Sequence, residues 1–239
     1  NSSLPLSVIS VTKSSDFPTR NAHNSTLGGT TSGVYVKLRD DLKQLLVGTY
    51  IGGSGYDAAY SIKVDDQKNT FIGGGTTTSN MFNSFTGFDK TYNGSIDGFI
   101  VKFNEAGQML FGSYFGTSSY DQIYFIDLDD ENNVYAYGQT EGFIRSATFD
   151  NNIATPNVGY RAGNFIFKMN GNLSNLLWQT TVGERRTSGT VNPLLSPSAF
   201  AVNDCKQILF AGWGGYNNWY EDAVCINEDR YVYGETDYV

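Results

Sequence analysis

The chain has 239 residues, 40% of them hydrophobic, and a formal net charge of −8. This length and composition fit one large globular domain, or part of one, with enough apolar residues for a core. The acidic balance and the lack of a basic stripe argue against nucleic-acid binding, which requires clustered positive charge. No apolar run approaches the length of a membrane-spanning helix, so we do not expect the chain to span a membrane.

A strand pattern that ends in lysine occurs three times, at residues 34–37, 99–102 and 165–168, with the lysines 65 and 66 residues apart. After each copy come a polar turn, a second apolar strand that closes on glycine, a third strand, an acidic turn and a fourth strand. Gly, Asn and Asp tolerate the positive φ that tight turns need. No sustained helical period is present, so we predict an all-β fold of four-stranded antiparallel units. The three units span about 33–77, 98–141 and 164–215.

One such unit cannot bury its two faces and two edges alone. Stacking successive units around an axis solves this, and the predicted architecture is a β-propeller whose blades are the units. Three blades do not close a ring, since four to eight are typical. Residues 7–19 are predicted to end an earlier blade, and residues 223–236 to supply the third and fourth strands of a later one. We therefore expect residues 1–239 to be a single propeller domain or a fragment of a larger ring, interrupted near 216–223.

Several segments resemble a known family. Residues 49–65, TYIGGSGYDAAYSIKVD, and residues 91–104, TYNGSIDGFIVKFN, are similar to the secreted bacterial repeat called SBBP, a seven-bladed β-propeller repeat. Residues 14–19, SSDFPT, look like the element that follows a strand in that family. Residues 196–215 resemble a blade variant in large surface proteins of Bacteroidetes. The resemblance covers about residues 8–216.

The resemblance also implies a setting. Proteins of this kind are commonly exported by the type IX secretion system, and some are related to gliding motility or adhesion. It therefore implies an extracellular or outer-surface location, with protein partners or surface glycans as ligands and with the secretion machinery as a further partner. The family has no shared catalytic motif, so no catalytic residue is carried over.

The chain has two cysteines, Cys205 and Cys225. In an exported protein they could form a disulfide, and the alternative is two unpaired or buried thiols, because spacing does not fix connectivity. His23 is the only histidine, so a structural zinc site, which takes four nitrogen or sulfur ligands, is not expected.

The acidic turns after each third strand are candidate calcium ligands. Residues 127–133, DLDDENN, place oxygen ligands in alternation, and residues 64–69 are their repeat equivalent. The alternative is an ordinary hairpin turn in which Asp and Asn bind backbone groups. Lys68 and Cys205 interrupt the ligand pattern, so we expect hairpin turns and no cofactor.

Asp57 and Asp121 occupy the same repeat position, just before the third strand. Two such carboxylates facing an axial channel could act as the acid and base of a glycoside hydrolase. The alternative, which we favour, is that each binds backbone amides of the adjacent turn.

Aromatic residues cluster after a fourth strand. Tyr216, Trp219 and Tyr220 lie among Gly and Asn, and exposed rings beside amides suit sugar stacking or protein contacts. These three are the predicted binding residues, whereas Trp213 is expected to pack between blades.

Two long polar inserts, about residues 76–97 and 140–163, are predicted to lie between blades and to form a second candidate surface. Loops on a rigid scaffold commonly carry binding. Their phenylalanines are Phe82, Phe85, Phe88, Phe143 and Phe149.

These patterns favour a non-enzymatic cell-surface or secreted module that binds or scaffolds. The alternative is a secreted carbohydrate-active hydrolase or lyase with a propeller fold. A pocket that holds two carboxylates at catalytic separation would favour the enzyme.

Overall fold

The computed structural model describes residues 4–144, 163–182, 193 and 195–214. These residues form thirteen strands in antiparallel sheets, which confirms the all-β prediction. Among them no helix is long and apolar enough to cross a membrane. The strands are β1 (Leu6–Thr12), β2 (Ser32–Leu38), β3 (Leu45–Ile51), β4 (Asp57–Val64), β5 (Thr70–Thr76), β6 (Asp97–Phe103), β7 (Met109–Phe115), β8 (Asp121–Leu128), β9 (Val134–Thr140), β10 (Asn164–Met169), β11 (Leu176–Val182), β12 (Leu195–Val202) and β13 (Ile208–Gly214).

The strands group into sheets differently from the sequence prediction. The sheets are β1-β2-β3, β4-β5-β6-β7, β8-β9-β10-β11 and β12-β13. The predicted unit 33–77 contains β2 to β5, which belong to two sheets, and the units 98–141 and 164–215 are divided in the same way. The predicted boundaries are therefore wrong by two strands. Strand β1 was assigned to an earlier unit, but it pairs with β2 along its whole length.

The long inserts lie within sheets and not between them. Residues 77–96 connect β5 to β6, which are hydrogen-bonded neighbours, and residues 141–163 connect β9 to β10, which also pair. The first three sheets are connected by the short segments 52–56 and 116–120. The prediction that the inserts separate the units is therefore wrong.

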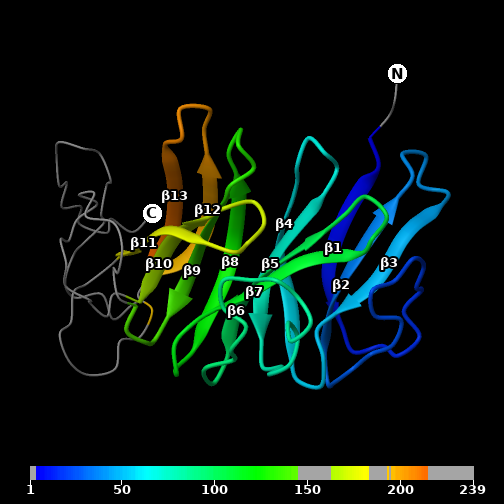
Figure 1. The fold of residues 1–239 in the computed structure, drawn as a ribbon, viewed down its shortest axis with the longest axis horizontal. Coiled ribbons are helices and arrows are strands. Elements are labelled where there is room, and N and C mark those ends of the chain that lie inside the picture. Colours follow the sequence, from blue (N-terminus) through cyan, green and yellow to red (C-terminus); the bar gives the residue numbers. More distant parts are fainter. Residues whose placement is uncertain (1–3, 145–162, 183–192, 194, 215–239) are drawn as a thin grey trace.

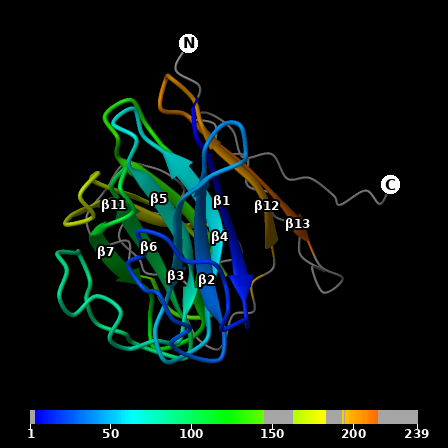
Figure 2. The same cartoon turned by 90° about the vertical axis from the view of Figure 1, so that its right-hand side faces the viewer.

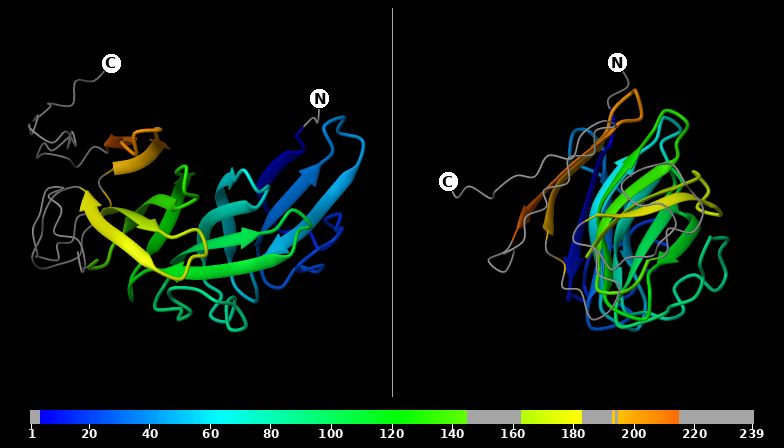
Figure 3. Two further views of the ribbon diagram at one scale, coloured as in Figure 1. Left: turned by 45° about the horizontal axis from the view of Figure 1, so that its top comes forward. Right: turned by 90° about the vertical axis from the view of Figure 1, so that its left-hand side faces the viewer.

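The sheets stack face against face and follow one another along an open arc (Figures 1, 2 and 3). Strand β4 packs against β1 of the preceding sheet and β8 of the following one, and β8 in turn packs against β12. Strands β4, β8 and β12 each begin a sheet, and we call them the first strands. They form neighbouring edges of three successive sheets.

The core lies in layers between the sheets, because successive residues of a strand point to opposite faces. Phe99 of β6 packs in the layer that contains Tyr35 of β2, whereas Ile100 packs in the layer that contains Phe165 of β10. Every residue of β5 and β6 is buried. A side chain at Gly74 would collide with the carbonyl of Ala58 and the ring of Phe99, which explains the glycine inside this strand.

Candidate functional site

The aromatic residues predicted to bind ligand, Tyr216, Trp219 and Tyr220, lie outside the described residues, so their role stays a prediction. Cys205 is exposed and unbonded in the structure, and Cys225 lies outside the described residues. The disulfide between them stays a prediction as well.

Two other aromatic residues lie where the sequence did not place them. Trp213 is 70% exposed, so the prediction that it packs between blades is wrong. It stands on β13, in the last of the described sheets, which has another described sheet on only one face. Phe82, in the insert after β5, is fully buried and its ring centroid lies 4.6 Å from that of Tyr114. Part of this insert therefore belongs to the core.

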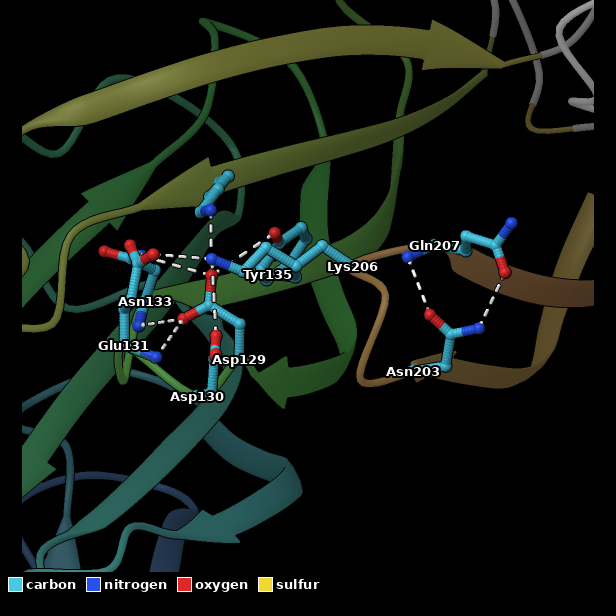
Figure 4. Close-up of polar contacts among 9 residues, drawn as sticks. Asp129, Asp130, Glu131, Asn133, Tyr135, Asn203, Lys206 and Gln207 are labelled. Atoms are coloured by element: carbon cyan, nitrogen blue, oxygen red, sulfur yellow. Dashed lines mark hydrogen bonds and ion pairs between the residues drawn. The ribbon is translucent and has the colours of Figure 1, made fainter.

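The acidic turns are hairpin turns held by their own side chains. In the β4–β5 turn, Asp65 accepts hydrogen bonds from the backbone and side-chain N–H groups of Asn69, at 2.7 and 2.8 Å. In the β8–β9 turn, Asp129 accepts the same two hydrogen bonds from Asn133, at 2.9 and 3.1 Å (Figure 4). Protein donors thus occupy the oxygens that calcium would need, and the expected hairpin role is confirmed.

The repeated lysines pair with the acidic turns of their own sheets, and Lys102 also reaches the next sheet. Lys102 Nζ lies 3.5 Å from the carboxylate of Asp65 and donates a hydrogen bond to the carbonyl of Gly171, at 3.1 Å, in the turn after β10. Lys168 forms the equivalent ion pair with Asp129, at 2.8 Å. Burial raises the pKa of Asp129, but the hydrogen bonds from Lys168 and Asn133 outweigh it and lower this pKa overall. The lysine that marks the repeat is therefore structural.

A second lysine links the same turn to the sheet that follows. Lys206 of the β12–β13 turn forms ion pairs with Asp130 and Glu131, at 3.3 and 2.5 Å (Figure 4). These groups are exposed, so the ion pairs contribute little stability.

Asp57 is buried and holds the loop before its own strand. It accepts hydrogen bonds from the N–H of Gly53, at 2.9 Å, and from the hydroxyl of Thr78, at 3.1 Å, and a further one from the hydroxyl of Thr76. Burial raises the pKa of Asp57, and these hydrogen bonds offset part of the rise. Asp121 likewise accepts the N–H of Thr117, at 2.6 Å. The expected amide-binding role of both residues is confirmed.

A partly exposed aromatic pair, Tyr60 and Tyr124, spans the first strands of two neighbouring sheets. Their ring centroids are 5.3 Å apart and their planes differ by 14°. The hydroxyl of Tyr124 forms a hydrogen bond with that of Tyr120, at 2.8 Å. Tyr60 is 40% exposed. Tyr56, which directly precedes β4, is 61% exposed. We call Tyr56, Tyr60, Tyr120 and Tyr124 the tyrosine surface.

Local irregularities in the strands position this pair. The register of β4 against β5 shifts between Ala59 and Ser61, and that of β8 against β9 shifts between Ile123 and Phe125. Such bulges redirect a side chain out of the ladder. The hydroxyl of Ser61 accepts the N–H of Ile126, at 3.0 Å, and fixes the two strands beside each other.

Strand β12, the equivalent strand of the next sheet, has the same register shift but no tyrosine at it. The register of β12 shifts between Pro197 and Ala199, and Ser198 stands at the equivalent position. The bulge is therefore part of the repeated fold, whereas the tyrosine is not required by it.

Burial raises the pKa of the Tyr60 hydroxyl, and the neighbouring Tyr124 raises it further. Burial and the hydrogen bond with Tyr124 raise the pKa of Tyr120. These hydroxyls stay protonated at neutral pH and can donate hydrogen bonds to a ligand.

Sequence reasoning missed the tyrosine surface and also Asp97, a buried carboxylate beside Asp121. The signal for the tyrosines was present, because Tyr-Asp at 56–57 and 120–121 is followed three residues later by Tyr60 and Tyr124. Their exposure depends on the bulges, which the sequence does not mark.

Comparison of the chain with protein-family models finds no matching family, and comparison with curated proteins finds no matching relative.

Proposed function

We propose that this chain is part of a β-propeller and acts as a non-enzymatic binding module at the cell surface or in the extracellular space. Four-stranded sheets that stack face against face, with their first strands side by side, support the propeller architecture. The similarity of residues 49–65 and 91–104 to the SBBP repeat supports export, with type IX secretion and a role in adhesion or motility as the proposed setting.

The tyrosine surface is the proposed contact for the ligand, and surface glycans are the proposed ligand class. The observation that carries this proposal is the stacked Tyr60–Tyr124 pair, which is partly exposed and built across two sheets. The apolar face of a sugar ring packs on such an aromatic platform, while protonated tyrosine hydroxyls donate to sugar oxygens.

The alternative enzyme class receives less support. Asp57 and Asp121, the candidate acid and base, are buried and accept hydrogen bonds from protein groups. A glycoside hydrolase needs two carboxylates that reach the substrate. Binding is therefore the better supported function for the described residues.

A glycan array followed by calorimetry on the best ligand tests the proposal. We expect Tyr60→Ala and Tyr124→Ala each to weaken binding about fivefold, because each removes a stacking ring worth roughly 1 kcal/mol. Tyr60→Phe keeps the ring and is expected to retain most of the affinity. Trp213→Ala removes an exposed ring on another sheet and is the control.

Unchanged affinity in both alanine variants would show that the tyrosine surface is not the contact. Binding to a protein partner, with no binding to any glycan, would show that the proposed ligand class is wrong. The same variants would then test the tyrosine surface with that partner.

A further inference from the structure

The first sheet lacks the strand with which the next two sheets begin. Its order is β1-β2-β3, whereas the second and third sheets are β4-β5-β6-β7 and β8-β9-β10-β11. The repeated lysines fix the correspondence, because Ser7 pairs with Lys37 as Phe71 pairs with Lys102. Strand β1 is therefore the equivalent of β5. Among the described residues no strand pairs with its other side, and we call that side the open edge.

Strand β1 is exposed at positions where the equivalent strands are buried. Every residue of β5 and of β9 is buried, and each of these strands pairs with a first strand. Val11 of β1 pairs with Gly33, at which a Cβ would lie 3.1 Å from that of Ala59 in β4. Val11 therefore lies on the face that meets the second sheet, yet it is 43% exposed. The second sheet alone does not cover the open edge.

Strand β1 also has none of the features that protect neighbouring sheet edges. The unpaired N–H and C=O groups of a regular edge strand attract another strand, and bulges, charges, prolines or covering loops prevent this. Strands β4, β8 and β12 have register shifts. The outer edges β3 and β7 bind loops, since Tyr50 donates its N–H to Asn24 and Tyr114 donates its N–H to Asp89. Strand β1, LSVISVT, has no register shift, charge or proline.

Strand β4, which packs beside β1, is also incompletely covered (Figure 1). Strand β8 packs against β4, β5 and β6 of the preceding sheet, whereas β4 meets β1 and β2 and has no preceding first strand to contact. Ile62 of β4 is half-buried, whereas its equivalent Ile126 is 1% exposed. Val64 is 49% exposed, whereas its equivalent Leu128 is half-buried. A strand at the open edge would continue the row of first strands and cover β4.

The row of first strands also shows which side chains such a strand would use. The hydroxyl of Ser61 in β4 accepts the N–H of Ile126 in β8, at 3.0 Å. The equivalent N–H on β4 is that of Ile62, and among the described residues no side chain accepts it. A serine or threonine at the position equivalent to Ser61 could accept it, followed by an apolar residue equivalent to Ile62.

We propose that the open edge binds an extended segment of another protein chain, which pairs antiparallel with β1 and takes the place of a first strand. Main-chain hydrogen bonds to β1 would supply the affinity, as in other complexes formed by strand addition. The serine or threonine and the apolar residue beside it would supply the specificity. The surface continues an interface that the molecule already uses, because β4, β8 and β12 pack side by side in the same way.

A second copy of this chain that pairs through its own β1 does not fit this edge. Antiparallel pairing of two β1 strands would relate the copies by a two-fold axis perpendicular to the sheet. Strand β4 covers the same face of the first sheet in each copy, beside the open edge. The two β4 strands would therefore collide over the paired edges. An extended segment brings no second layer and avoids the collision.

A synthetic peptide with the sequence of residues 56–65, YDAAYSIKVD, tests the proposal, because β4 holds the equivalent place beside β5. Fluorescence anisotropy of the labelled peptide measures binding, and hydrogen exchange of the protein locates it. We expect the amides of β1 to exchange at least tenfold more slowly when the peptide is bound. The same peptide with Ser61→Pro and Lys63→Pro, which lacks two N–H groups, should not bind.

A matched pair of protein variants tests the position of the peptide. Val8→Lys puts a charge on β1 and should weaken peptide binding at least tenfold, because a lysine on an edge strand opposes strand addition. Leu209→Lys makes the same kind of change on β13 and should leave the affinity unchanged. Val8 and Leu209 are 40% and 58% exposed, so both variants should fold.

Three outcomes would overturn the proposal. Equal affinity of the peptide for Val8→Lys and the unmodified protein would show that β1 is not the contact. Slower exchange in β4 and β8 with none in β1 would place the peptide on the tyrosine surface. An unmodified protein that does not bind the peptide, and whose β1 amides already exchange slowly, would show that this chain covers the open edge itself.

Discussion

The junction between the first two sheets and the junction between the second and third sheets have the same backbone arrangement but different numbers of carboxylates. In both, the N–H of the aspartate that begins a first strand donates to a carbonyl of the preceding sheet: Asp57 to Thr31, at 3.2 Å, and Asp121 to Ile96, at 2.8 Å. Thr31 is followed by the neutral Ser32, whereas Ile96 is followed by Asp97, whose charge interacts with that of Asp121. One residue therefore separates a junction with one carboxylate from a junction with two.

The difference shows how a repeat can change its charge balance without changing its fold. Asp57 has both oxygens bound by protein donors, and its role ends with the loop that it holds. In the second junction, Oδ1 of Asp97 is buried and forms no hydrogen bond. The same frame thus satisfies its carboxylate in one copy and adds an incompletely satisfied carboxylate in the next.

The largest expected change in the free energy of unfolding comes from replacing one aspartate in each junction with asparagine. Asp57→Asn should lower the free energy of unfolding by about 3 kcal/mol, because an amide NH₂ cannot accept the hydrogen bonds of Gly53 and Thr78. Asp97→Asn should raise it by about 1 kcal/mol, because it removes a buried charge. Urea unfolding at pH 7.5 measures both, and changes of the same sign would contradict the account.

Converting the first junction into a copy of the second is the next largest test. Ser32→Asp places a second carboxylate near Asp57 and should lower the free energy of unfolding by about 2 kcal/mol at pH 7.5. Lowering the pH to 5 should restore part of this loss, because a proton then neutralises the pair. Ser32→Asn, nearly equal to aspartate in size but neutral, is the matched control and should lack this recovery.

The smallest expected effect is the pH dependence of the unmodified protein. Burial, together with the charges of Asp121 and Asp89, raises the pKa of Asp97 from 3.8 to about 6. Since the folded state then holds this proton more tightly than the unfolded state, stability rises as pH falls through 6. The gain between pH 7.5 and pH 5 should be about 1 kcal/mol.

Asp57 and Asp121 also have raised pKa values and contribute in the same direction. Asp97→Asn should therefore flatten the profile without abolishing the slope. A profile that is identical in Asp97→Asn and the unmodified protein would show that Asp97 does not titrate in this range.

The strands could be predicted from the sequence, but the sheet boundaries could not. A repeat period has no marked beginning, and the long polar segment 76–97 is expected to be a boundary. The structure places that segment between two hydrogen-bonded strands, β5 and β6, and uses the short segment 52–56 to pass between sheets. Loop length alone therefore does not distinguish a turn within a sheet from a connection between sheets.

The site was less predictable than the fold. The amide-binding role of Asp57 follows from its place after a glycine-rich loop, and the sequence was sufficient for it. The second junction brings Asp97 and Asp121 together across two sheets, and their proximity depends on the stacking of β6 and β8. The cue available in the sequence is that Ser32, Asp97 and Asn164 differ at one repeat position.

An NMR titration of the side-chain carboxyl carbons tests the central claim most directly. The account predicts a pKa of about 6 for Asp97, well above its ordinary value of 3.8. A pKa of Asp97 close to that ordinary value would contradict it.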